Sequence, residues 1–127
     1  MAAKTFGALT TGLQTVTATG AVTPTAGLDI SGITQDYTIW LQVQSLTAAK
    51  KIVITLEDSV DAFTASVPIA SFNPVGAVAS AADRKYSLRK YQIPSLRAGT
   101  TSAVARLNVT AIDSATTAIV QAWIEYN

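Results

Sequence analysis

Residues 37–46 read Tyr-Thr-Ile-Trp-Leu-Gln-Val-Gln-Ser-Leu, with an apolar residue at every second position through Val43. Successive side chains of a strand point to opposite faces, so one face of this segment is apolar. Its members are Tyr37, Ile39, Leu41 and Val43. The other face is polar except for Trp40. This pattern predicts a half-buried strand, in which Trp40 either packs in a second layer or contacts a partner.

Four further segments extend this strand pattern along the chain. Residues 52–58 place three large aliphatic side chains on one face, and the short charged connection before them predicts antiparallel pairing with residues 37–46. Residues 84–93 alternate again and stop at Pro94. Residues 103–112 and 117–126 flank a four-residue turn and therefore predict a hairpin.

The number of strands and the absence of long helical periods decide the fold class. Seven or eight short strands joined by Gly, Pro and Asn turns predict an all-β protein, an antiparallel β-sandwich of jelly-roll or immunoglobulin-like kind. A closed barrel is the alternative. Residues 13–127 are expected to form this single domain. Residues 1–12 show no steady period and are expected to form an extended N-terminal arm that docks Phe6 and Leu9 on a neighbour.

Composition argues against an enzyme. The chain of 127 residues contains no histidine and no cysteine, which removes the usual general base, the commonest metal ligand and all thiolate chemistry. Neither a G-x-S-x-G nucleophile motif nor a phosphate-binding loop is present. We therefore expect no catalytic residues, no metal site and no cofactor.

The low charge content points to a surface that another protein covers. Only 13% of the residues are charged, about half the usual share of roughly 25%. No apolar run approaches the length of about 20 residues that a membrane-spanning helix needs, and no secretory signal is visible. We expect a protein that is made in a cytoplasm and binds no membrane.

Five cations gather in one region, at Arg84, Lys85, Arg89, Lys90 and Arg97, with tyrosines between them. Such a run can neutralise phosphates while tyrosines stack on bases. The sequence pI of about 8.0 is low for a nucleic-acid-binding domain, so nucleic acid is not the favoured partner. A surface strand that meets acidic groups, in this chain or the next, is favoured instead.

Two smaller clusters have competing interpretations. The first cluster consists of the carboxylates of Glu57, Asp58 and Asp61. The residue spacing of a calcium-binding loop is absent. A solvated acidic turn, which could meet a basic patch of another subunit, is therefore favoured over a metal site. A set of aromatic residues provides a possible sugar platform, although strand tryptophans of β-sandwiches more often belong to the core. The set comprises Trp40, Trp123 and Tyr126.

The chain resembles the small virion proteins of tailed bacteriophages, most closely the capsid decoration (cement) proteins. The resemblance lies in residues 40–43, 54–59 and 89–94 and in the Ala/Thr/Val-rich composition without His or Cys. It implies a protein made in the bacterial host cytoplasm that binds the major capsid protein on the outer surface of the virion, with a homotrimer as the typical state. The N-terminal arm and the basic strand Arg84–Arg97 are the expected contacts.

Three alternatives to a decoration protein stay open at this point. The first is another virion part, such as a small coat, neck or tail protein. The second is a non-catalytic glycan-binding β-sandwich module. The third is a protein that binds single-stranded nucleic acid, which would lose affinity steeply with added salt.

Overall fold

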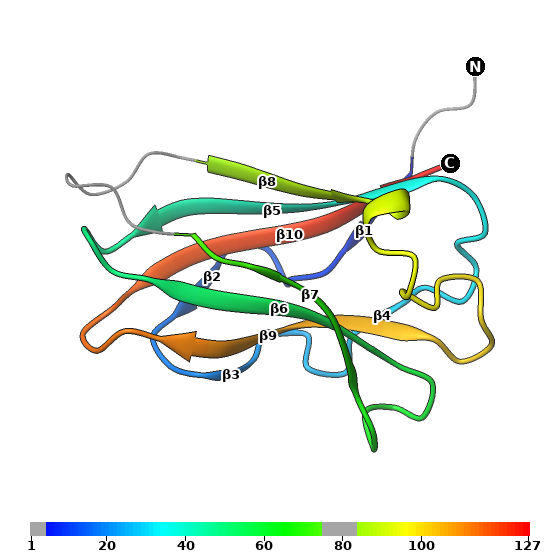
Figure 1. Ribbon diagram of the computed structural model, residues 1–127, viewed down its shortest axis with the longest axis horizontal. Coiled ribbons are helices and arrows are strands. Elements are labelled where there is room, and N and C mark those ends of the chain that lie inside the picture. Colours follow the sequence, from blue (N-terminus) through cyan, green and yellow to red (C-terminus); the bar gives the residue numbers. More distant parts are fainter. Residues whose placement is uncertain (1–4, 75–83) are drawn as a thin grey trace.

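The structure is a computed structural model that describes residues 5–74 and 84–127. Two antiparallel sheets pack face to face, and Figure 1 shows sheet A above sheet B. Sheet A contains β1 (Thr5–Ala8), β2 (Gln14–Val16), β5 (Tyr37–Leu46), β8 (Arg84–Arg89) and β10 (Ala118–Tyr126). Sheet B contains β3 (Gly20–Ala21), β4 (Leu28–Asp29), β6 (Ile52–Ser59), β7 (Val67–Phe72) and β9 (Val104–Ile112). A short 3₁₀ helix, η1 (Lys90–Gln92), follows β8.

The strand pairing is that of a jelly roll. β1 and β2 both pair with β10, and β3 and β4 both pair with β9. β5 pairs with β8, and β6 pairs with β7. These pairs nest inside one another, as in a long hairpin that has been rolled into two sheets. The all-β sandwich expected from the sequence is confirmed, and of its two proposed topologies the jelly roll is the one observed.

The core forms where the apolar faces of β5 and β6 meet between the sheets. All four apolar members of the β5 pattern are buried, and Leu41 is 0% exposed. Ile52, Ile54 and Leu56 of β6 are buried from the other sheet. The alternation in the sequence therefore predicted correctly which faces of these two strands are inside.

The predicted pairing of neighbouring strands is wrong in two places. β5 and β6 lie in different sheets, and so do β9 and β10, so neither pair is a hairpin. Their connections cross from one sheet to the other. Each strand instead pairs with a partner that is distant in the sequence: β5 pairs with β10, and β6 pairs with β9. The apolar faces of β5 and β6 can then face each other across the core.

The expected arm is part of the sandwich wherever the structure describes it. β1 pairs with the end of β10, from Thr5 opposite Tyr126 to Ala8 opposite Trp123. Leu9 is 1% exposed and belongs to the core, so it is not available to a neighbouring subunit. Residues 1–4 lie outside the described residues.

β8 is shorter than the predicted segment 84–93. After Arg89 the chain turns into η1, because the side chain of Gln92 accepts a hydrogen bond from the Arg89 N–H (2.8 Å). The Ile93 N–H then donates to the Lys90 carbonyl (3.2 Å), and the Ile93 side chain is buried in the core. Within the described ranges, no helix has the length and apolar character needed to cross a bilayer.

Candidate functional site

The outer face of sheet A carries two tryptophans at its centre. Trp40 of β5 lies directly opposite Trp123 of β10, and neither ring points into the core. Their ring centroids are 6.4 Å apart and their planes differ by 19°. Trp40 thus supports Trp123 from the neighbouring strand. Tyr126 does not join them, because it packs against the core, so the expected aromatic set of three is corrected to a pair.

One edge of this face is basic. Lys85 lies opposite Gln42 and Arg89 lies opposite Thr38, so both cations are on the outer face and both are exposed. η1 then adds the exposed side chains of Lys90 and Tyr91, of which Tyr91 is 75% exposed. We call Lys85, Arg89, Lys90 and Tyr91 the basic edge. Arg84 is half-buried and alternates to the inner side of β8.

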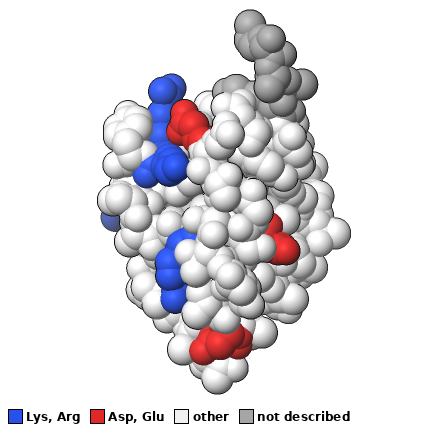
Figure 2. Space-filling view, turned by 90° about the vertical axis from the view of Figure 1, so that its right-hand side faces the viewer, with Lys and Arg blue, Asp and Glu red and all other residues white. Residues whose placement is uncertain are grey.

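Charged side chains are sparse at the end of the sandwich that carries η1. Figure 2 shows this end, where small patches of both signs interrupt a surface that is otherwise uncharged. This fits the low charge content of the sequence. A cluster of exposed cations beside an exposed tyrosine is therefore a distinctive feature of this molecule.

The opposite edge of sheet A holds a groove of about 450 Å³ beside Trp123. β1 lies three strand spacings from β8, which is about 14 Å at a spacing of about 4.8 Å. Phe6 of β1 lies opposite Glu125 on the outer face and is 62% exposed. Phe6, Ala8, Gln42, Gln121 and Trp123 are among the residues that line this cavity, which we call the Trp123 groove.

A detour of the backbone between β1 and β2 opens this groove. Thr10 is buried, and its hydroxyl accepts a hydrogen bond from the Ala122 N–H (3.0 Å) and donates to the Gly12 carbonyl (2.8 Å). The Ala122 carbonyl in turn accepts from the N–H groups of Leu9 and Thr10. The Thr10 hydroxyl therefore takes the place of a backbone acceptor at the point where the chain leaves the sheet. Two residues later, Gly12 adopts a φ of 61°, a left-handed conformation that glycine tolerates.

The solvated turn that the sequence suggested is wrong for two members of the acidic cluster, because Glu57 and Asp58 are buried. Asp58 is 0% exposed, and its carboxylate accepts hydrogen bonds from the Arg97 guanidinium (2.8 and 3.2 Å) and from the Arg97 N–H (2.8 Å). The side-chain hydrogen bonds to Asp58 raise the pKa of the Arg97 guanidinium. The Arg97 guanidinium is thus paired within this chain while 34% of its side chain stays exposed, and its expected contact with a capsid or a subunit stays a prediction.

Glu57 is buried as well, on the other side of β6. Its carboxylate accepts from Nε of Arg106 at 2.6 Å. The same guanidinium donates to the Thr25 carbonyl (2.9 Å) and lies 3.9 Å above the ring of Phe63, a cation–π contact. Because both carboxylates have partners within this chain, neither is available to a basic patch of another subunit.

Asp61 is the exposed member of the acidic cluster. Hydrogen bonds from the Ser59 hydroxyl (2.6 Å) and the Ala65 N–H (3.0 Å) lower the pKa of its carboxyl. They close the turn that follows β6. Among the residues that the structure describes, no group of three acidic side chains is placed to hold a metal ion.

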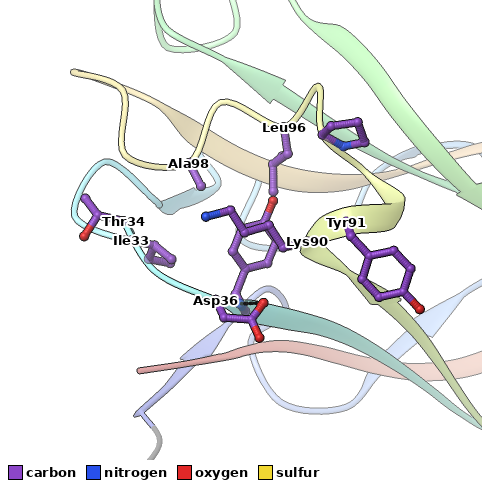
Figure 3. Close-up of a pocket in the computed structure, with 9 residues that line it drawn as sticks. Ile33, Thr34, Asp36, Lys90, Tyr91, Leu96 and Ala98 are labelled. Atoms are coloured by element: carbon purple, nitrogen blue, oxygen red, sulfur yellow. Dashed lines mark hydrogen bonds between the residues drawn. The ribbon is translucent and has the colours of Figure 1, made fainter.

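A second hollow, of about 390 Å³, lies at the end of the sandwich. Its inner wall is apolar and includes Ile33 and Tyr37. Figure 3 shows the nitrogen of Lys90 reaching over the hollow, whereas the ring of Tyr91 points away from it. Burial raises the pKa of the Tyr37 phenol to about 12, with smaller contributions from Asp36 and Asp58.

Tyr37 makes the stability depend on alkaline pH. The pKa of Tyr37 in the folded protein, about 12, exceeds the value near 10 in an unfolded chain. The stability that the neutral Tyr37 phenol contributes is therefore complete below pH 10 and is lost as the pH rises from 10 to 12. Urea unfolding at pH 9 and pH 11.5 should show a larger loss of stability for the wild type than for Tyr37→Phe. Equal losses in the two proteins would contradict this role of Tyr37.

The structure divides the residues singled out from the sequence into three groups. Phe6, Lys85 and Arg89 share the outer face of sheet A, and Lys90 lies beside them on η1. Leu9 belongs to the core, Arg97 is half-buried and pairs with Asp58, and Arg84 alternates to the other side of β8.

The sequence reasoning missed Gln121 and the pairing of the two tryptophans. The signal was present, because residues 118–126 place Ile119, Gln121, Trp123 and Glu125 on one face. What the sequence does not contain is the position of this face next to that of β5.

Comparison of the chain with models of protein families, with curated proteins and with solved structures found no match.

Proposed function

We propose that this protein is a non-catalytic structural component of a tailed-phage virion, a decoration protein that binds the outer capsid surface through the basic edge. The observation that carries the proposal is the placement of Lys85, Arg89 and Lys90 along one exposed edge that ends at the exposed ring of Tyr91. Arg97 and Arg106 are paired with the buried carboxylates of Asp58 and Glu57, whereas these cations face outward.

The residue types of the basic edge suit a protein partner. Arginine and tyrosine are enriched among the residues that dominate binding energy in interfaces. Cations at the border of such an interface accelerate association with an acidic surface and fix its orientation. The partner proposed here is an acidic region of the major capsid protein. Jelly rolls occur in viral capsid and lectin domains, but a fold alone does not assign a function, so the proposal rests on this edge.

The stabilising mechanism would be thermodynamic. A protein that binds the assembled shell, but not its free subunits, shifts the equilibrium toward the shell by mass action. A homotrimer would present three basic edges to the lattice, and simultaneous attachment would convert weak single contacts into durable ones. No chemical step is required of any residue, in keeping with a sequence that lacks His and Cys.

Charge reversal on the basic edge tests the proposal directly. The double variant Lys85→Glu/Arg89→Glu should reduce binding to capsids at least tenfold, because two attractive contacts become repulsive. The assay is co-sedimentation with expanded capsids of the major capsid protein encoded by the same genome. Lys50→Glu/Lys51→Glu makes the same change of charge in the β5–β6 connection and should bind normally.

Three results would refute the proposal. They are the absence of a major capsid protein gene from that genome, failure of the wild type to bind expanded capsids, and equal capsid binding by both double variants. The mass of the protein in solution separates the remaining virion roles, since a decoration protein stays a small oligomer whereas a coat protein assembles into large particles. Tight, salt-sensitive binding to single-stranded DNA in place of capsids would favour a nucleic-acid-binding protein.

A further inference from the structure

The Trp123 groove has the chemistry of a ligand site and extends from the β1 edge of sheet A over β10 to Gln42 of β5. The aromatic rings of Phe6 and Trp123 line it. Two carboxamides, from Gln42 and Gln121, line it as well, and they are neighbours across β5 and β10. Its volume of about 450 Å³ is within the range of about 300–1,000 Å³ typical of small-molecule sites.

The lining excludes several classes of ligand. Among the described residues, no charged side chain lines the groove, so it provides nothing to neutralise a phosphate or a carboxylate. It also offers little aliphatic surface for the side chain of an apolar peptide, since Ala8 and Ala122 are its aliphatic residues. The ligand that fits is therefore uncharged, polar at its edges and flat enough to lie against an aromatic ring.

A neutral sugar has these properties. The C–H bonds on one face of a pyranose ring make that face apolar, and this face packs against aromatic rings. Its hydroxyls donate and accept hydrogen bonds, and a glutamine carboxamide can do both at once with neighbouring hydroxyls. Trp40 contributes indirectly, because its ring lies next to that of Trp123 and limits the positions that Trp123 can take.

We infer that the Trp123 groove binds a neutral glycan, with Phe6 and Trp123 packing on the sugar rings and Gln121 pairing with hydroxyls. None of the four basic-edge residues lines this groove, although Gln42 at its β5 side lies opposite Lys85. The groove extends over β1, β10 and β5, and its Phe6 end lies three strand spacings, about 14 Å, from β8. A molecule attached to a capsid through β8 would keep that end open to solvent. The inference goes beyond the proposed structural function and does not depend on it.

The test is a glycan microarray of neutral and acidic oligosaccharides, followed by calorimetric titration with the neutral hexasaccharide that gives the strongest signal. Wild-type protein should bind neutral glycans, and Trp123→Ala should lose at least tenfold in affinity. Because loss of Trp123 also removes a contact of Trp40, Gln121→Glu serves as the second variant. It leaves the aromatic residues in place and should also lose at least tenfold. Tyr91→Ala removes an exposed aromatic ring outside the groove and should bind as the wild type does.

Absence of neutral glycan binding at millimolar concentration, a preference for acidic glycans, or unchanged affinity in Gln121→Glu would overturn the inference. The two proposals fail separately. Arg89→Glu/Lys90→Glu changes the part of the basic edge that does not adjoin Gln42, so it should keep glycan affinity while losing capsid binding. Gln121→Glu should do the reverse. If the basic-edge variant loses glycan binding by the same factor as Gln121→Glu, the site is not the Trp123 groove.

Discussion

Replacement of Arg97 by methionine should lower the free energy of unfolding by clearly more than replacement of an exposed lysine does. The loss of stability arises because the substitution leaves the partner of Arg97, the carboxylate of Asp58, in place. The Asp58 carboxylate is completely buried and receives three hydrogen bonds from Arg97, one of them from the backbone. Without the guanidinium, a buried charge keeps only the backbone donor, and the methionine side chain fills the space without supplying a donor.

A double-mutant cycle separates the ion pair from general loss of packing. Asp58→Asn/Arg97→Met removes both charges, and it should regain about half of the stability that Arg97→Met loses, because no buried charge is left unpaired. The measurement is urea unfolding at pH 7. Lys51→Met removes an exposed cation and should change stability by less than about 0.5 kcal/mol. A loss in Arg97→Met no greater than in Lys51→Met would show that the pair contributes little.

This ion pair illustrates why the candidate site could be predicted only in part. Asp58 and Arg97 are 39 residues apart, and nothing local indicates that the loop after Pro94 returns to the end of β6. Acidic residues next to a turn are ordinarily solvated, so the sequence argued for exposure. By contrast, the exposure of Lys85 and Arg89 follows from alternation within one strand, and that local rule placed them correctly.

The same distinction between local and long-range information holds for the fold. Periodicity assigned the inner faces of β5 and β6, because burial repeats every second residue in a strand. It could not assign partners, because an alternating segment pairs equally well with several others. In the jelly roll the partner of β5 is β10, more than 70 residues later, while β6 lies in the other sheet. The N-terminal segment was misjudged for a related reason: β1 is only four residues long, too short to show a period.

Leu41→Ala should lower the free energy of unfolding by about 3 kcal/mol and the melting temperature by about 10 °C. Leu41 lies at the middle of β5 and is 0% exposed, facing the apolar side of sheet B. Truncation to alanine removes buried apolar surface and leaves a cavity, since strands that pair on both sides cannot move inward to fill it.

The control for this change lies three residues further along the same strand. Gln44 is exposed, next to the irregularity in the pairing of β5 with β10, so Gln44→Ala should change stability by less than about 0.5 kcal/mol. Thermal unfolding followed by circular dichroism gives both values. If the two substitutions lower the free energy of unfolding by the same amount, β5 is not the strand on which the two sheets pack.

The packing of sheet A on sheet B also fixes β8 and β10. These two strands position the basic edge and Trp123, so a destabilised core should weaken both proposed surfaces together.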